Sequence, residues 1–397
     1  MSSKPFDIIL IGATGFTGKR AAHYLKDKTP VNLKWGIAAR NNNKLDRIAD
    51  ELSVTDDRRF IVDTTNTEQV ESVVKQARII ITTVGPFSLY GEEVIAACSK
   101  FGTHYLDITG EVGFIKQMKD KYESQAHKSG AQLIPFSGFD SVPADIAAFL
   151  LSKEFDQPKK LSIKAYYSIS GGFNGGTIAT MLNKFETGEY KKMNDPRLLL
   201  DNSGQKIHPP EKAKYFGYDK KISRWSAPFI MGSINSKVVY KSASLRFESG
   251  DPYAESISYC EHSSLGRWYN PIPFLVVSTI LLSITLLGPQ KWFRTFLKKI
   301  MPAPGEGPSE EQIENGYFKM TAFAKDSKGN EASLDISYPG DPGNKSTVFF
   351  LCESALCLAE SEDEITSKTG FLTPSVAFGE SLIDRLKARG LNIKTNL

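Results

Sequence analysis

In the first third of the chain, short apolar runs alternate with helix-length amphipathic stretches. Such runs are typical of parallel strands buried on both faces, and the stretches between them are typical of helices that cover the sheet. The pattern predicts strands at residues 6–11, 33–39, 59–63, 78–84, 103–108 and 132–137. It predicts helices at residues 16–27, 44–52, 68–75, 91–101 and 113–129. This is enough for a complete doubly wound sheet.

Beyond about residue 148 the pattern changes to strand-like segments separated by loops that carry glycine and proline. We expect strands at residues 160–169, 237–247, 256–259, 317–325 and 331–338. Helices are predicted at 348–360 and 375–389, the second opened by Thr373-Pro374 and closed by Gly390. The predicted fold is α/β: a Rossmann-type doubly wound parallel sheet (1–148), an α+β second domain (149–347) and C-terminal helices (348–397) that return to the first domain.

A glycine-rich turn, Gly12-Ala13-Thr14-Gly15-Phe16-Thr17-Gly18, joins the first predicted strand to the first helix. Glycines there let the backbone approach a pyrophosphate, and the helix N-terminus offers N–H groups and a partial positive charge. We expect these seven residues to bind a dinucleotide. The spacing Gly-x-x-Gly-x-x-Gly differs from the common Gly-x-Gly-x-x-Gly and is more frequent in NADP-dependent reductases. A glycine-rich turn without a ligand is the alternative.

Side chains after the next strands refine this expectation. Arg40 ends the second strand, where an NAD enzyme usually carries an acidic residue, and therefore favours the 2′-phosphate of NADP(H) over NAD(H). The alternative is a solvated strand-end residue with weak preference. Asp63 is placed to approach the adenine edge, although aspartate at a strand end is often only a turn former. Gly85, Pro86 and Phe87 follow the fourth strand and are expected near the middle of the cofactor.

Composition sets the class of protein. A chain of 397 residues with 41% hydrophobic and 24% charged residues is folded and comfortably forms two domains. A net charge of +4 provides no basic stripe for nucleic acid. Four irregularly spaced cysteines and scattered histidines indicate a reduced compartment and no metal site. We also expect no secretory leader and, without a Gly-x-Ser-x-Gly motif, no simple hydrolase.

Residues 272–288 form an uncharged apolar segment bounded by Pro271 and Pro289. As a helix this segment is roughly 25 Å long, short of a hydrocarbon core of about 30 Å, so we expect a shallow, one-sided attachment rather than a span. Lysines, an arginine and aromatic residues follow up to residue 299, as in segments that anionic lipid attracts. The alternative is a helix buried in the second domain or in a dimer interface.

Four ordered motifs carry a family resemblance: residues 12–18, residues 85–91, Tyr105-Leu106-Asp107-Ile108-Thr109-Gly110-Glu111, and residues 138–145 (GFDSVPAD). They resemble the saccharopine dehydrogenase-like oxidoreductases, a group that includes the mycobacterial trans-acting enoyl reductases. The likeness continues through Gly175-Gly176-Thr177, the apolar segment, residues 302–308 and Thr373-Pro374. The resemblance implies reduction of a double bond in a lipid or polyketide-like chain, and relatives on membranes and lipid droplets.

Hydride transfer to a double bond needs a proton donor for the second atom. The carboxyl edge of the predicted sheet offers Tyr90, Asp107, Glu111 and Asp140 as catalytic candidates. Each has a structural alternative, because Asp140 with Ser141 can cap a helix, Glu111 can hold a loop N–H and Tyr90 can pack against the cofactor.

The sequence thus predicts an NADP(H)-dependent oxidoreductase that reduces an enoyl or related double bond of an apolar substrate. We expect it inside the cell, on the cytoplasmic face of a membrane or lipid droplet through residues 272–299, with a homodimer plausible from the β-rich second domain. One alternative is a non-catalytic nucleotide-binding tether on lipid surfaces. The other is a saccharopine-type imine reductase, which needs converging arginines, whereas Arg197, Arg224, Arg246, Arg267 and Arg294 are scattered.

Overall fold

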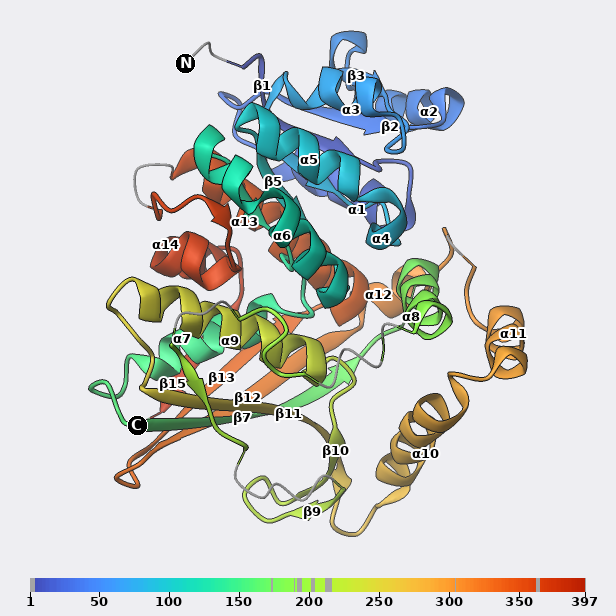
Figure 1. Cartoon of the computed structure of the whole chain (residues 1–397). Helices are drawn as coiled ribbons and strands as arrows, with labels where there is room; N and C mark the ends of the chain where they lie inside the picture. Colours follow the sequence, from blue (N-terminus) through green and yellow to red (C-terminus); the bar gives the residue numbers. More distant parts are fainter. Residues whose placement is uncertain are drawn as a thin grey trace.

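Two sheets with helices between them make up the protein (Figure 1). The structure is a computed structural model that describes residues 4–172, 174–188, 190, 195–200, 204–210, 216–303, 305–361 and 365–396. Helices α7, α9, α13 and α14 fill the space between the parallel sheet and the second sheet (Figure 1). The predicted α/β fold with a second, mixed domain is confirmed.

The N-terminal sheet has seven parallel strands in the order β14-β6-β5-β4-β1-β2-β3. Its strands are β1 (Phe6–Ile11), β2 (Trp35–Ala39), β3 (Arg59–Ile61), β4 (Ala77–Thr82), β5 (His104–Asp107), β6 (Gln132–Ile134) and β14 (Gly370–Phe371). Its helices are α1 (Phe16–Lys28), α2 (Asn42–Leu52), α3 (Thr67–Val74), α4 (Phe87–Tyr90), α5 (Glu92–Phe101) and α6 (Val112–Ser129), with a short η1 (Asp56–Arg58) before β3. The strands of the doubly wound order match the predicted strands, and β14 is an unpredicted addition from the C-terminal region.

Strand β1 shows why the apolar runs predicted this sheet correctly. Ile8 and Leu10 belong to the hydrophobic cluster on one face, while Ile9 and Ile11 belong to the cluster on the other. All four are fully buried or nearly so. A strand covered by helices on both faces needs apolar side chains at every position, so its sequence loses the alternation of a half-exposed strand.

The second sheet is mixed, with the order β15-β13-β12-β7-β11-β10-β9 and β8 paired to β11. Its strands are β7 (Lys160–Ser170), β8 (Lys206–Ile207), β9 (Gly217–Asp219), β10 (Arg224–Pro228), β11 (Ser256–Arg267), β12 (Tyr317–Asp326), β13 (Glu331–Pro339) and β15 (Asn392–Asn396). The central strands β7 and β11 are parallel, and β12 pairs antiparallel with β7. Four of the five strands predicted in this region are present.

The fifth predicted strand, residues 237–247, is wrong: this segment belongs to helix α9 (Gly232–Glu248). Every residue from Lys237 to Leu245 is buried in the structure. A helix enclosed on several sides has no exposed polar stripe, so the 3.6-residue period is missing from its sequence. The run Val238-Val239-Tyr240 then resembles a strand.

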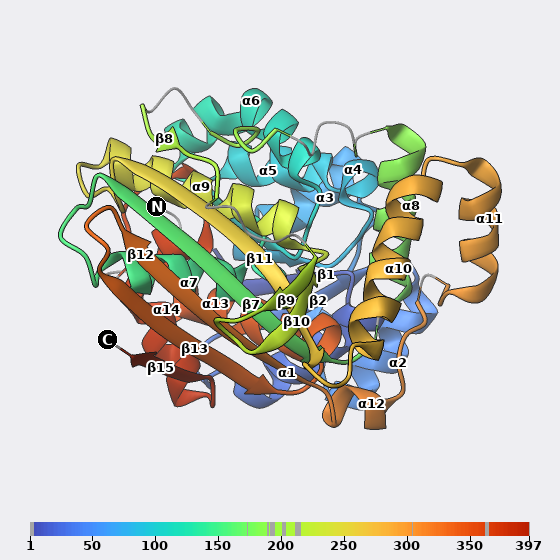
Figure 2. The same ribbon diagram turned by 90° about the horizontal axis from the view of Figure 1, so that it is seen from below.

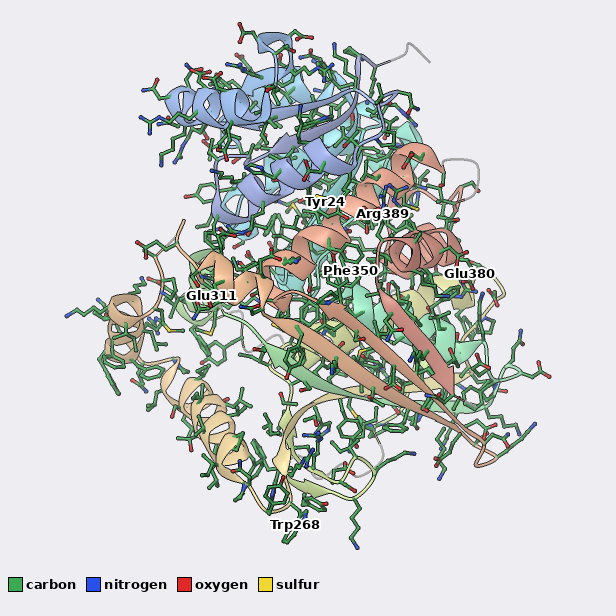
Figure 3. The ribbon with its side chains drawn as sticks, turned by 180° about the vertical axis from the view of Figure 1, so that it is seen from behind. Tyr24, Trp268, Glu311, Phe350, Glu380 and Arg389 are labelled. Carbon is green, nitrogen blue, oxygen red and sulfur yellow. The ribbon has the colours of Figure 1, made fainter. Side chains whose placement is uncertain are left out.

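The C-terminal helices return to the first domain, as predicted. Helices α7 (Val142–Ser152), α13 (Thr347–Glu360), preceded by a π-helical turn η3 (Pro342–Ser346), and α14 (Pro374–Ala388) pack in the core with α9. Glu353 of α13 is fully buried and accepts a hydrogen bond of 2.6 Å from the hydroxyl of Tyr24 on α1. The same carboxylate pairs with Arg385 of α14 and with Arg389, the residue that follows α14. Figure 3 labels Tyr24 and Arg389. The ion pairs join α13 to α14, and the hydrogen bond from Tyr24 ties α13 to the nucleotide-binding half of the chain.

Two helices, α10 (Ile272–Leu287) and α11 (Lys291–Ile300), lie at the side of the molecule next to α8 (Gly175–Thr187) (Figure 2). The side chains of α10 are largely exposed: Leu286 is 70% exposed and Ile272 66%, and Ser278 is the one buried residue. The apolar segment is therefore not a buried helix of this chain. Among the described residues, no helix combines the length and the hydropathy that crossing a bilayer requires.

Candidate functional site

The glycine-rich turn adopts a conformation that only glycines allow. Gly12 has φ of 93°, in the left-handed region that side chains disfavour. A Cβ on Gly18 would lie 2.0 Å from the carbonyl oxygen of Gly12, because α1 crosses directly over the end of β1. The Thr83 hydroxyl, at the end of β4, lies 3.4 Å from the Ile11 and Gly12 carbonyls. The turn is thus shaped by the packing of three elements.

The first turn of α1 leaves its N–H groups open for an anion. Its N-cap is Gly15, which has no side chain to accept from them, and no acidic residue lies in the first turn. The backbone N–H groups and the helix dipole are therefore available to a pyrophosphate. The residues of the turn fit a dinucleotide, whose phosphates would bind over Gly12–Gly18.

Arg40 and Asp63 lie together at the carboxyl edge of the sheet, after β2 and β3. Asp63 accepts hydrogen bonds from the backbone N–H of Thr65 at 3.0 Å and from its hydroxyl at 2.8 Å. These bonds and nearby Arg40 lower the pKa of Asp63. Arg40 itself is exposed, so its guanidinium is accessible to a phosphate beside the turn.

Glu111 holds the loop that follows β4. This buried carboxylate accepts hydrogen bonds from the backbone N–H groups of Phe87 at 2.7 Å and Ser88 at 3.0 Å. The Gly85–Pro86 peptide in this loop is cis. Both oxygens of Glu111 thereby fix the start of α4, which carries Tyr90 at a half-buried position. The contacts of Glu111 are those of a residue that positions Gly85, Pro86 and Phe87.

Asp107 has a similar set of partners at the end of β5. Its carboxylate accepts from the backbone N–H groups of Thr109 at 3.0 Å and Phe136 at 3.1 Å, and from the hydroxyl of Tyr105 at 2.7 Å. Burial raises the pKa of Asp107 to about 7, against the effect of these donors. Its contacts join the loops after β5 and β6.

Asp140, after β6, is placed differently from the other two carboxyl groups. It is partly exposed, and none of the hydrogen bonds between described residues uses its carboxylate. Its low-dielectric surroundings raise the pKa of Asp140 to about 6, while the ammonium of Lys184 acts in the opposite direction. A partly exposed carboxyl with a raised pKa at this edge has the properties of a proton donor.

A buried hydrogen-bond network lies beneath Asp140. The neighbouring Ser141 donates to the amide oxygen of Asn235 at 3.3 Å, and the amide nitrogen of Asn235 donates to Glu261 at 2.9 Å. The hydroxyls of Tyr167 and Tyr259 also donate to Glu261, at 3.3 and 2.7 Å. Burial, with a smaller contribution from Asp140, raises the pKa of Glu261 to about 7. The network connects the end of β6 to α9 and β11 of the second domain.

Helix α8 closes the site from the second domain. The amide of Asn183 donates to the Ser88 hydroxyl at 3.1 Å, and the Lys184 ammonium donates to the Gly110 carbonyl at 2.7 Å. The loops after β4 and β5 are thereby joined through one helix. Asn183 and Lys184 were not predicted, because no local pattern in the sequence shows which face of α8 meets the first domain.

Two arginines of the second domain, Arg246 and Arg294, have partners away from Asp140. Arg246 pairs with Asp251 and lies over the rings of Phe149 and Tyr253. Arg294 donates to the carbonyls of Gly288 and Pro289, at the start of α11. These two guanidinium groups therefore do not meet at Asp140 and Lys184, as a site for a substrate with several carboxylates would require.

Comparison with known proteins places this chain in a family. Residues 8–134 match the family model of the saccharopine dehydrogenase NADP-binding domain. A Mycobacterium tuberculosis protein named as a trans-acting enoyl reductase is 30% identical over 416 residues, covering 99% of this chain and 98% of the relative. The chain belongs to the saccharopine dehydrogenase-like family that includes the trans-acting enoyl reductases. The trans-acting enoyl reductase of Mycobacterium ulcerans is 29% identical, covering 98% of this chain and 97% of its own.

Solved structures share the fold of this saccharopine dehydrogenase-like protein. Saccharopine dehydrogenase (L-Glu forming) from Saccharomyces cerevisiae has a TM-score of 0.54 at 12% identity, covering 99% of this chain and all of its own. Homospermidine synthase from Legionella pneumophila has a TM-score of 0.52 at 12% identity, with 98% and 91% covered. The protein is an oxidoreductase with NADP(H) as its cofactor, which confirms the predicted enzyme class and cofactor.

Proposed function

We propose that this oxidoreductase reduces a C=C bond, conjugated to a carbonyl, in an apolar substrate. The observation that carries the proposal is Asp140: a partly exposed carboxyl with a raised pKa, beside Lys184, where β5 and β6 end. A conjugated double bond takes a hydride at one carbon and a proton at the other. NADP(H), when bound, supplies the hydride.

Residues of the chain bind the cofactor, hold the loops of the site and deliver the proton. The turn at residues 12–18 and Arg40 bind the phosphates, Glu111 holds the loop of Phe87, and Asp107 fixes the loops after β5 and β6. Asp140 transfers its proton to the substrate carbon that does not receive the hydride, and is left as a carboxylate beside Lys184. An ammonium next to that carboxylate stabilises the charge that appears as the proton leaves. Tyr90, the last residue of α4, stays a candidate donor.

Transfer of deuterium from NADPH to a lipid distinguishes reduction from the alternative function, a non-catalytic nucleotide-binding tether on lipid surfaces. The protein is incubated with NADPH that carries deuterium at both hydrogen positions of nicotinamide C4, and with vesicles that contain lipids with α,β-unsaturated acyl chains. We expect mass spectrometry to find one deuterium and one solvent proton in the reduced chain. Tight NADPH binding without label transfer to any enoyl or ketone lipid of a broad panel would support the tether instead.

Replacement of Arg40 by alanine is expected to weaken NADPH binding about tenfold, or about 1.4 kcal/mol, with NADH binding unchanged. The reason is that Arg40 is exposed beside the turn and would contact the 2′-phosphate, which NADH lacks. Titration by nicotinamide fluorescence measures both constants. Arg47→Ala, a charge change on the exposed side of α2, is the control. Equal losses for NADPH and NADH would assign Arg40 to another part of the cofactor.

We further propose that residues 272–299 attach the protein to a lipid surface on the cytoplasmic side. Helix α10 exposes leucine and isoleucine side chains, and the exposed Trp268, Tyr269 and Trp292 are residue types that favour a membrane interface. Figure 3 labels Trp268 near α10. Helix α11 adds Lys291, Lys298 and Lys299, which attract anionic headgroups, and about 1 kcal/mol per cation is typical near such a surface. A dimer through α10 is the competing use of this surface.

Co-sedimentation with vesicles tests the attachment. Leu275→Asp with Leu286→Asp is expected to reduce binding to vesicles of phosphatidylcholine and phosphatidylserine by more than about tenfold, because both apolar side chains are more than half exposed. Val31→Asp is the control, because Val31 is exposed. Leu150→Asp would be unsuitable, because Leu150 packs on the core. Unchanged sedimentation of the double variant, or a wild-type dimer that the variant splits, would contradict attachment through α10.

A further inference from the structure

The chain that leaves α11 passes directly over the cofactor turn. Residues 305–309, here called the strap, lie between α11, which ends at Ile300, and helix α12 (Glu310–Glu314). Gly307 of the strap lies so close to the ring of Phe16 that a Cβ would be 2.3 Å from a ring carbon. Phe16 is the first residue of α1, at the open N-terminus that fits the pyrophosphate. A backbone segment of the second domain thus packs against the phosphate-binding turn.

Polar contacts hold the strap at both ends. The carbonyl of Glu306 accepts a hydrogen bond of 2.9 Å from the backbone N–H of Gly175, the first residue of α8. Glu310 pairs with Arg20 of α1, and the Arg20 guanidinium lies 4.0 Å from the centre of the Phe16 ring. Only a few residues separate these contacts from the end of α11 at Ile300.

Helix α8 forms a second connection between the lipid-facing helices and the site. Gly288, between α10 and α11, packs on the ring of Phe185, where a Cβ would be 2.6 Å from ring carbons. Lys298 of α11 lies 3.8 Å from Glu186. On the adjacent positions of α8, Asn183 and Lys184 contact the loops after β4 and β5. Figure 2 shows α8 beside α10 and α11.

We propose that the strap couples binding of a lipid surface to binding of NADP(H). The inference rests on the proposed lipid attachment and adds its consequence for the cofactor site. A surface that immobilises α11 also holds the strap against Phe16, and with it the N-terminus of α1. The turn then needs less ordering when the cofactor binds, so affinity for NADPH rises on the surface.

Linkage makes the proposal quantitative. If vesicles raise the affinity for NADPH by a given factor, NADPH must raise the affinity for vesicles by the same factor. We expect about fivefold, at the lower end of typical couplings. Nicotinamide fluorescence measures the dissociation constant of NADPH with and without vesicles of phosphatidylcholine and phosphatidylserine. Co-sedimentation with and without saturating NADPH measures the reverse effect.

Charge reversal within α12 provides the matched pair of variants. Glu310→Arg places a like charge against Arg20 and is expected to abolish the coupling, while Glu311→Arg changes the net charge equally without that contact (Figure 3). Gly307→Ala is a second, uncharged way to move the strap from Phe16. Thermal unfolding checks that each variant is folded.

The outcomes separate this inference from the attachment on which it rests. Wild-type protein that sediments with vesicles but binds NADPH with an unchanged constant would overturn the coupling alone. Equal coupling in Glu310→Arg and Glu311→Arg would also overturn it. Failure of the wild type to bind vesicles would overturn the attachment and the coupling together. Fivefold effects in both directions, lost in Glu310→Arg and kept in Glu311→Arg, would support it.

Discussion

Gly18→Val is expected to reduce NADPH affinity at least about 100-fold, equivalent to about 2.7 kcal/mol. A Cβ at this position would lie 2.0 Å from the Gly12 carbonyl oxygen and 2.8 Å from the Thr83 hydroxyl. Because the first of these atoms is backbone, it cannot rotate away, and either α1 or the end of β1 must move. The N–H groups that would bind the pyrophosphate are carried by the same two segments, so the anion site is lost with the close approach.

Titration of the variant by nicotinamide fluorescence measures the effect. The neighbouring Lys19→Ala is the control, since Lys19 points to Glu51 with its ammonium 2.8 Å from the carboxylate, and should bind NADPH normally. Circular dichroism checks that the valine variant retains its secondary structure. A folded Gly18→Val protein with unchanged NADPH affinity would show that the cofactor does not bind at this turn.

Asp140→Asn is expected to lower the rate of substrate reduction about 1,000-fold, within the usual range for loss of a general acid. The amide has no proton of suitable acidity, but nearly the same shape, so NADPH affinity should be unchanged. In the wild type the acid must be protonated. Since the pKa of Asp140 is raised to about 6, activity should be highest below this value and fall as pH rises through it.

Single-turnover oxidation of bound NADPH over a range of pH tests this role. Asp140→Glu keeps a carboxyl group and should therefore restore part of the rate, with a rate that again falls as pH rises. If Asp140 had only a structural role, the rate would not need to follow the titration of this carboxyl. Asp120→Asn is the control, because Asp120 is exposed and pairs with Lys116 on the surface of α6. Full activity of Asp140→Asn would assign the proton to another group, with Tyr90 as the next candidate.

The parts of the fold that could be predicted are those whose environment leaves a local pattern. Strand β1 is covered on both faces and therefore has four consecutive buried apolar residues, and the turn after it needs glycines at Gly12 and Gly18. Helix α9 could not be predicted, because it is enclosed on several sides. The two-residue strand β14 owes its existence to pairing with β6, which no local signal reports.

The candidate site, too, could be predicted only in part from the sequence. The order of strands and turns placed Asp107, Glu111 and Asp140 at the correct edge of the sheet. Their different surroundings depend on loop conformation, since Glu111 and Asp107 accept backbone N–H groups, whereas Asp140 accepts none from the residues that the structure describes. Lys184 acts from α8, whose place against Gly110 is a result of tertiary packing alone. Its contribution to the site required the structure.

A crystal structure with bound NADP⁺ tests the central claim most directly. We predict the pyrophosphate over residues 12–18, the 2′-phosphate at Arg40, and the nicotinamide ring facing the space bounded by Gly110, Asp140 and Lys184. That arrangement would place hydride and proton delivery at one site. A nicotinamide that points away from Asp140, or a cofactor bound outside the glycine turn, would contradict the account.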